Sequence, residues 1–402
     1  MRGMQALAIG GLCALAVGAV SVVTAAVPAE SGLSALLAAY NGCGQQLFQA
    51  FAKKPGNIVL SPYSIGTAMA MALVGARGDN EVEMAKVLGL ELPRQEVNEA
   101  NAAALASLDK MSSASFQLRV ANALMLTKNG GVISEDYVAL LREKYAAEVF
   151  RGADLAAVND WVKKKTDGKI DSILDRLDPK TALVLLDAIY FKARWQRVFD
   201  AKATHDEPFH LVDGETQVPM MHLRSDFAVA ARPGYRAIRL PYEGARVGMV
   251  VILPDANIGD LVQPLDSDEM QSLLAALRTP AQPVALSLPR FHASFKASLV
   301  EPFAAMGMRR PFHAAMADFS GMTGKPQSEV PLQINQIMHR AVIDVAEEGT
   351  EAAAATGVAV GITAAQPRPI IITFRVDRPF LFAIVDDETG AILFEGRIVD
   401  PR

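Results

Sequence analysis

Side chains that could support enzyme chemistry are present in this sequence, but not at the spacings that catalysis requires. A serine nucleophile of the α/β-hydrolase type needs glycines around a strained turn, and the nearest run, Asp318-Phe319-Ser320-Gly321, lacks the first of them. The sequence also contains no Gly-rich phosphate loop, no dinucleotide fingerprint and no His-Glu-x-x-His motif. We therefore predict that the protein is not an enzyme and needs no cofactor.

The histidines, which could otherwise bind a metal ion, occur singly along the chain. The two that are closest in sequence, His205 and His210, flank Pro208 and are unsuited to a shared helical face. We interpret all the histidines as ordinary surface or core residues and predict no metal site.

One segment near the C-terminus is Ala-rich and contains almost nothing to bury. It follows a strand-like run at residues 341–346 and reads Glu347-Glu348-Gly349-Thr350-Glu351-Ala352-Ala353-Ala354-Ala355-Thr356-Gly357. Composition alone favours a short exposed helix. As a strand, the segment would instead present a small-to-apolar face formed by Thr350, Ala352, Ala354 and Thr356, with Glu351 on the opposite face. Such a strand could enter a sheet without burying a charge.

The rest of the chain must supply the elements that hold this segment. Of its 402 residues, 51% are apolar and 21% charged, which is enough for a large core. Helical spacing dominates as far as residue 166, and apolar runs of strand length follow at residues 182–191, 247–253, 284–288, 370–374 and 380–385. No linker or repeat divides the chain, so we predict one α+β domain over residues 31–402.

The N-terminus and the charge balance bear on location and partners. Arg2, an apolar stretch at residues 7–23 and the small residues Thr24-Ala25-Ala26 predict a signal peptide over residues 1–26, with a retained membrane anchor as the alternative. We expect a secreted or periplasmic protein that leaves the membrane after cleavage. The net charge of -5 comes from intermixed acids and bases, which argues against nucleic acid as a partner. Cys13 lies in the signal segment, so Cys43 would remain alone without a disulfide.

The Ala-rich segment resembles the hinge of inhibitory serpins, and Phe374-Arg375-Val376-Asp377-Arg378-Pro379-Phe380 resembles the signature that follows their reactive loop. Other matches occur in family order, among them Asn57-Ile58-Val59-Leu60-Ser61-Pro62-Tyr63-Ser64-Ile65, Asp187-Ala188-Ile189-Tyr190-Phe191-Lys192-Ala193-Arg194-Trp195 and His339-Arg340-Ala341. The resemblance implies eight or nine helices around three β-sheets, an exposed reactive loop at about residues 350–369, and a monomer. The absence of an Asn-x-Ser/Thr site fits a prokaryotic source.

The resemblance also implies a suicide mechanism. A serine protease would cut the loop and form an acyl-enzyme, after which the hinge would insert into the main sheet and trap the enzyme. Family spacing places the cut at Thr363-Ala364, with Ile362 as an alternative, and these residues suit an elastase-like or subtilisin-like pocket. A non-inhibitory serpin with a binding or chaperone role and an inhibitor of cysteine proteases are the alternatives. Residues 95–108 are acidic or neutral, so we expect no heparin site.

Two groups of supporting residues carry over from the family. The breach, where the loop would begin to enter the sheet, comprises Trp195, Arg290 and Glu347. The shutter, in the middle of the sheet, comprises Ser61, Ser64, Asp187 and His339. Asp187 departs from the family, which usually has asparagine there. It is either a near-isostere or the partner of a protonated His339 that makes sheet opening depend on pH.

Overall fold

The computed structural model describes residues 29–152, 154–255, 263–350 and 370–402. Three predicted features lie outside these ranges: the signal segment, the hinge from Glu351 to Thr356, and the bond at Thr363-Ala364 with its alternative Ile362. The helices in the described ranges are α1 (Ala29–Ala52), α2 (Pro62–Gly75), α3 (Gly78–Leu88), α4 (Arg94–Asp109), α5 (Glu135–Tyr145), α6 (Leu155–Lys165), α7 (Ser267–Ala276), α8 (Val300–Ala305) and α9 (Ser320–Thr323).

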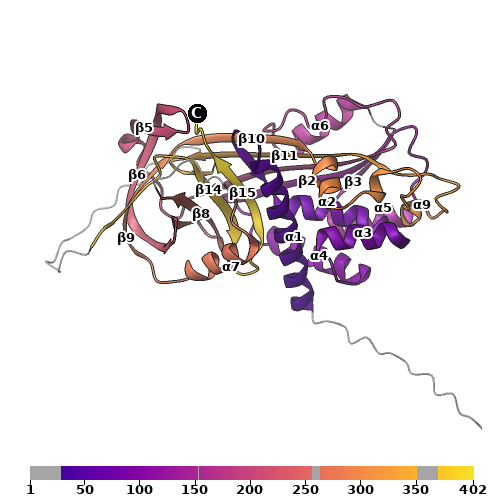
Figure 1. Cartoon of the computed structure of the whole chain (residues 1–402), viewed down its shortest axis with the longest axis horizontal. Coiled ribbons are helices and arrows are strands. Elements are labelled where there is room, and N and C mark those ends of the chain that lie inside the picture. The colour runs from indigo at the N-terminus through magenta and orange to yellow at the C-terminus, as the bar shows by residue number, and fades with distance from the viewer. Residues whose placement is uncertain (1–28, 153, 256–262, 351–369) are drawn as a thin grey trace, which may run out of the picture.

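A six-stranded sheet runs along the length of the molecule (Figure 1). Its strands in spatial order are β10 (Phe291–Ser298), β11 (Ile334–Ala346), β12 (Gly349–Thr350), β4 (Leu183–Arg194), β2 (Phe116–Leu126) and β3 (Glu148–Arg151). The two central strands β11 and β4 also pair directly with each other, in parallel orientation. This parallel contact lies in the middle of the sheet, directly below the short strand β12.

The other strands form a nine-stranded path. They are β1 (Ile58–Leu60), β15 (Ile392–Ile398), β14 (Phe380–Asp386), β8 (Val247–Pro254), β7 (Tyr235–Pro241), β6 (Gly214–Arg232), β9 (Gln282–Pro289) and β13 (Ile372–Arg375), with β5 (His205–Leu211) paired to β6. The long strand β6 pairs with β5 and β9 in its first part and with β7 in its last part, so it links two sheets. Together with the six-stranded sheet, these make the three sheets that the family resemblance implied.

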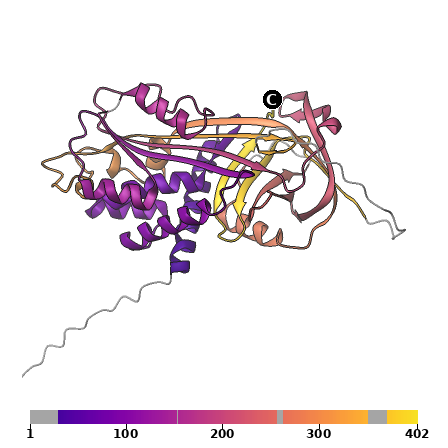
Figure 2. The same cartoon turned by 180° about the vertical axis from the view of Figure 1, so that it is seen from behind.

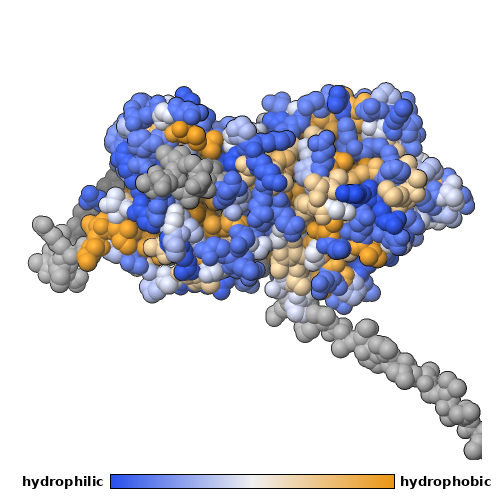
Figure 3. Space-filling model, in the orientation of Figure 1, coloured by the Kyte–Doolittle hydropathy of each residue, from blue (hydrophilic) through white to orange (hydrophobic). Residues whose placement is uncertain are grey.

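Helices cover both faces of the six-stranded sheet, as Figures 1 and 2 show from opposite sides. The larger core lies between this sheet, the helices α1 and α2, and the strands β14 and β15. A smaller cluster, which includes Val158, Trp161 and Val162 of α6, packs on the other face of the sheet. Hydrophilic side chains cover much of the outer surface in the view of Figure 3.

The start of helix α2, which lies beneath the six-stranded sheet, is fixed by a capping residue and a proline. Ser61 caps it by accepting a hydrogen bond from the backbone N–H of Ser64 at 3.1 Å, and Pro62 occupies the first helical turn. Every residue of α2 is buried. At Gly66 an added Cβ would lie 2.2 Å from the ring of Tyr40, so the glycine allows α1 to approach closely.

The predicted α+β class is confirmed, and most of the predicted strands are present with shifted ends. The run at residues 182–191 forms β4, and the run at residues 247–253 forms β8. The division into a helical first half and a strand-rich second half was incomplete, because the eleven-residue strand β2 lies in the first half. Gln117 and Arg119 interrupt its apolar pattern because the first part of β2 is only half-buried, whereas its last six residues are buried.

Two further observations concern the described helices. Among the described helices, none has both the length and the hydropathy needed to cross a bilayer. Cys43 lies on the buried side of α1, and burial raises the pKa of its thiol to about 12.

Candidate functional site at the base of the reactive loop

The last two described residues before the segment 351–369 lie within the six-stranded sheet. Gly349 and Thr350 form β12, which pairs antiparallel with Val345 and Ala346 of β11 on one side and with Ala193 and Arg194 of β4 on the other. Direct pairing of β11 with β4 begins beyond this point, at Ile343 and Phe191. The short strand β12 therefore separates the ends of two strands that otherwise touch.

Aromatic side chains support β12 from the core side. The ring of Trp195 stacks on that of Tyr242, with centroids 4.6 Å apart and planes 9° apart. The hydroxyl of Tyr242 lies 2.8 Å from Oγ1 of Thr350, which is fully buried. Burial raises the pKa of Tyr242, and its hydrogen bond to Thr350 acts in the opposite direction, so the phenol stays neutral. Thr350 is thus held by packing and by a satisfied hydrogen bond.

Backbone hydrogen bonds fix the turn between β11 and β12. The indole Nε1 of Trp195 donates to the carbonyl of Ala346 at 2.9 Å, and its backbone N–H donates to the carbonyl of Glu348 at 2.8 Å. The N–H of Phe199 donates to the carbonyl of Glu347 at 2.8 Å. An added Cβ on Gly349 would lie 2.0 Å from the carbonyl oxygen of Ala193, so only glycine fits here.

The three breach residues lie together, as the family resemblance implied. Nη1 of Arg290 is 3.8 Å from Oε1 of Glu347, and Trp195 holds the backbone on either side of Glu347 through the bonds just described. The side chain of Arg290 is 52% exposed, whereas that of Glu347 is 12% exposed. This half-exposed ion pair is a weak contact compared with the aromatic packing beside it.

The shutter residues also meet, below the middle of the sheet. Nδ1 of His339 lies 2.7 Å from Oδ2 of Asp187, and the hydroxyl of Ser64 donates to Oδ1 of the same carboxylate. Asp187 and His339 are directly opposite each other in the parallel β4–β11 pair. Ser61 does not contact the carboxylate and serves instead as the cap that holds the first turn of α2. Asp187 therefore does contact His339, the geometry that its pairing with a charged histidine would require.

Several buried polar atoms around the shutter have no hydrogen-bond partner among the described residues. These are Nε2 of His339 and both side-chain amide atoms of Asn122, which lies opposite Asp187 on β2. An unpaired buried polar group typically costs about 1–3 kcal/mol. Three buried polar atoms in the middle of the sheet are thus without a hydrogen bond, whereas the hydroxyl of Thr350 at the upper end has one.

A second buried carboxyl lies on β15, next to the strand that leads into α2. Glu395 is opposite Leu60 of β1 and is 1% exposed. Burial raises its pKa to about 8, so the group is largely protonated at neutral pH. Sequence reasoning missed Glu395 because nothing in its immediate neighbours distinguishes it from an exposed strand residue.

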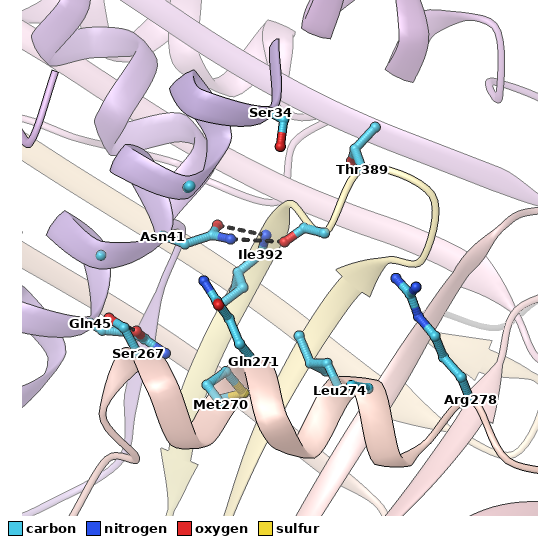
Figure 4. A pocket seen from close by; sticks show the side chains of 14 residues that line it. Ser34, Asn41, Gln45, Ser267, Met270, Gln271, Leu274, Arg278, Thr389 and Ile392 are labelled. Atoms are coloured by element: carbon cyan, nitrogen blue, oxygen red, sulfur yellow. Dashed lines mark hydrogen bonds between the residues drawn. The ribbon is translucent and has the colours of Figure 1, made fainter. Parts of the chain in front are cut away.

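A pocket of about 260 Å³ opens between α1, α7 and the turn that joins β14 to β15. Figure 4 shows Asn41 on its wall, where the side chain donates to the carbonyl of Gly390 at 2.8 Å and accepts from the N–H of Ile392 at 2.9 Å. The hydroxyl of Ser267 donates to Gln45 at 2.5 Å. No motif in the sequence indicates this pocket, because its lining residues come from three distant segments.

Comparisons with known proteins agree with this architecture. The family model described as serpin, serine protease inhibitor, matches residues 38–401. An uncharacterised serpin-like protein of Thermococcus kodakarensis is 37% identical over 90% of this chain and 85% of its own length. The leukocyte elastase inhibitor of Bos taurus is 38% identical over 86% of this chain and 93% of its own length.

Solved structures give the same result. The thermophilic serpin tengpin in its native state aligns with a TM-score of 0.81 at 26% identity and covers 94% of this chain and 96% of its own. Human thyroxine-binding globulin in complex with thyroxine aligns with a TM-score of 0.81 at 26% identity over 93% of this chain and 99% of its own.

Proposed function

This chain belongs to the serpin family, and from that premise we propose that it is a suicide inhibitor of a serine protease. The target would cut the exposed loop and become covalently attached as an acyl-enzyme. The hinge would then enter the six-stranded sheet between β11 and β4 and carry the protease with it. The single observation that carries the proposal is the position of β12, which already occupies the entrance between these strands.

Extending the register of β12 indicates what insertion would replace. Thr350 is opposite Ala193 on β4 and Val345 on β11, and both pairings are antiparallel. Each further loop residue would therefore face the preceding residue on both neighbours. Six steps bring Thr356 between Asp187 and His339, the two residues that now face each other directly. Thr356 would bring a hydroxyl to the unpartnered Nε2 of His339.

The same register favours the small side chains of the hinge. Ala354 would lie between Ile189 and Ala341, both fully buried, where a larger or charged side chain could not be accommodated. Glu351 would lie between Lys192 and Asp344 on the opposite face, where both neighbours are half-buried. The hinge could thus insert without moving a charge into the core.

Insertion would also improve the hydrogen bonding of the sheet. The present β11–β4 contact is a single parallel ladder from Ile334–Leu183 to Ile343–Phe191. A strand inserted between them would replace it with two antiparallel ladders, which are more stable per residue than a parallel one. The native fold would then be held in a less stable arrangement until the loop is cut.

The target and the location are inferred from the sequence. Cleavage at Thr363-Ala364, or one residue earlier after Ile362, would suit an elastase-like or subtilisin-like protease. An inhibitor of elastase among the relatives supports this class of target. The signal segment at residues 1–26 would direct the protein to the periplasm or the exterior, where it would meet such enzymes.

The decisive experiment incubates the protein with an elastase, a subtilisin and a trypsin and examines the products on a denaturing gel. We expect an SDS-stable complex with the first two enzymes and none with trypsin. Sequencing the new N-terminus should begin at Ala364. Cleavage of the loop without any complex, by all three proteases, would contradict inhibition.

A hormone-carrier type of function is the second candidate, and the pocket between α1 and α7 is the observation that favours it. One structural relative is a globulin that binds thyroxine. Thermal stabilisation by an aromatic ligand, combined with the absence of any protease complex, would support this candidate over the first.

A further inference from the structure

Three potential metal ligands, His205, Glu207 and His222, meet on the β5–β6 hairpin. Nε2 of His205 lies 2.9 Å from Oε1 of Glu207, and Nε2 of His222 lies 3.1 Å from the same oxygen. The ligand atoms of the three side chains all lie within 4.8 Å of one another. The two imidazole rings stack with centroids 4.8 Å apart.

Hairpin geometry explains why the cluster forms. His205 and Glu207 are two residues apart on β5 and therefore share a face, while Met220 of β6 lies opposite His205. His222 is two residues beyond Met220 and so lies on that face as well. The sequence did not suggest this group, because the hairpin turn joins residues that are well separated along the chain.

Both histidines are oriented through their other ring nitrogen. Nδ1 of His205 lies 3.0 Å from the carbonyl of Ala203, and because a carbonyl only accepts, Nδ1 must carry the proton. Nδ1 of His222 lies 3.1 Å from the hydroxyl of Ser287 on β9. Nε2 of both rings therefore faces Glu207. This is the arrangement that outer-shell partners give to metal-binding histidines.

The carboxylate of Glu207 presents one oxygen to the two histidines. Its Oε1 lies 2.9 Å from Nε2 of His205 and 3.1 Å from Nε2 of His222. The other oxygen lies 2.8 Å from Nη2 of Arg375, which leaves Oε1 directed at the histidines. Two imidazole nitrogens and one carboxylate group therefore offer ligand atoms to the same small volume.

We propose that His205, Glu207 and His222 form a binding site for a divalent transition-metal ion of the zinc type. Imidazole nitrogens with one carboxylate suit Zn²⁺, Cu²⁺ or Ni²⁺ rather than Mg²⁺ or Ca²⁺. Ligand atoms around tetrahedral Zn²⁺ are roughly 3.3 Å apart. The two nitrogen–oxygen separations of 2.9 and 3.1 Å are close to that value, and the ligand nitrogens of the two histidines lie within 4.8 Å of each other. The side chain of His205 is 63% exposed, so an ion and a completing water can enter from solvent.

The site would tie the edge strand β5 to β6 beside β13, the strand that follows the reactive loop. Arg375 of β13 is opposite Ser287 of β9, which in turn is opposite His222 of β6. A row of contacts thus joins the ligands to the end of the loop.

The test titrates full-length protein, free of any affinity tag, with Zn²⁺ in a calorimeter and measures thermal unfolding with and without the ion. We expect one Zn²⁺ per chain and a higher melting temperature in its presence. His205→Ala and His222→Ala should each weaken binding by at least about tenfold, and the outer-shell change Ser287→Ala by about tenfold.

The matched controls are His210→Ala and His292→Ala. Each removes a histidine that lies beside a single carboxylate, Glu215 and Asp344 respectively, and both variants should bind Zn²⁺ as the unchanged chain does. Binding of Mg²⁺ with equal affinity, unchanged Zn²⁺ binding in His205→Ala, or an equal loss in His210→Ala would each overturn the proposal. Because the His205 side chain is mostly exposed, we expect His205→Ala to fold normally, so that a loss of Zn²⁺ binding can be attributed to the missing ligand.

Discussion

The two ends of the path that the hinge would follow are built differently. At the upper end, Thr350 is buried against Trp195 and Tyr242, and its hydroxyl is hydrogen-bonded. In the middle, Asp187 and His339 face each other directly, and Nε2 of His339 has no partner among the described residues. The sheet is therefore already open at β12, where insertion would start, but β4 and β11 still pair directly at Asp187 and His339, where insertion would have to proceed. The difference suggests that the middle of the sheet, and not its entrance, limits the speed of trapping.

The largest effect is expected from a charge placed in the hinge, where it would have to enter the sheet between β11 and β4. Ala354→Glu would bury a carboxylate between Ile189 and Ala341 on insertion, at a cost of several kcal/mol. We expect the variant to be cleaved as a substrate, with at least about a tenfold loss of covalent complex on a denaturing gel. Glu351→Gln, on the outward face, is the matched control and should keep the yield of complex. An undiminished yield from Ala354→Glu would rule out the proposed register.

Thr350→Arg tests the entrance itself. Because Thr350 is already fully buried in the native fold, the arginine should lower the stability of the uncut protein as well as the yield of complex. The stability cost should again amount to several kcal/mol, measured as a lower denaturant midpoint. A variant that lost complex formation at full native stability would show that Thr350 is not held in the sheet before cleavage.

The dependence of stability on pH tests the buried carboxyl group of Glu395 on β15. Burial raises the folded-state pKa of Glu395 from 4.5 to about 8, so the folded protein keeps its proton where the unfolded chain has lost it. Stability from this group is full below pH 4.5 and falls by about 1.4 kcal/mol per pH unit as the pH rises toward 8. Glu395→Gln should flatten this fall when denaturant midpoints are compared at pH 5, 6.5 and 8. Parallel profiles for both proteins would refute the assignment.

The shutter offers a smaller effect. Asp187→Asn removes the charge that Ser64 and His339 now contact, which should change stability by about 1.5–3 kcal/mol. If a protonated His339 pairs with Asp187, opening of the sheet should depend on pH. The rate at which the uncut protein converts to a latent form, with its loop inserted in the sheet, should then vary with pH in the unchanged protein and less so in Asp187→Asn. Identical pH profiles would favour the near-isostere interpretation. Ser61→Ala, which affects only the helix cap, is the control for general destabilisation.

The smallest expected effect is at the breach. Tyr242→Phe keeps the stacking on Trp195 but removes one hydrogen bond to Thr350, at a cost of about 1 kcal/mol. Arg290→Met removes a half-exposed ion pair worth no more than about 1 kcal/mol. In thermal unfolding, the loss of stability in Tyr242→Phe should therefore equal or slightly exceed the loss in Arg290→Met. A larger effect from Arg290→Met would mean that the ion pair, and not aromatic packing, holds the entrance.

Much of this comparison could be anticipated from the sequence, and some could not. The hinge was predicted from the run from Glu347 to Thr356, and the breach and shutter residues were predicted from the family resemblance. The structure brings Arg290 to Glu347 and His339 to Asp187, whereas the hinge from Glu351 onward lies outside the described residues. The entry of β12 into the sheet could not be found this way, because it depends on the register between strands about 150 residues apart in sequence. The strand β2 was missed because Gln117 and Arg119 interrupt its apolar pattern. The cluster of His205, Glu207 and His222 depends on a hairpin pairing that residue spacing alone does not reveal.

The buried thiol of Cys43 gives this fold a built-in reporter. With its pKa raised to about 12 and only 3% of the residue exposed, the thiol should resist alkylation while α1 stays packed. Its labelling rate would then report how often the packing around α1 opens enough to expose the thiol. A change in that rate when the loop is cut would show whether the helices beneath the sheet tighten as the strand arrives.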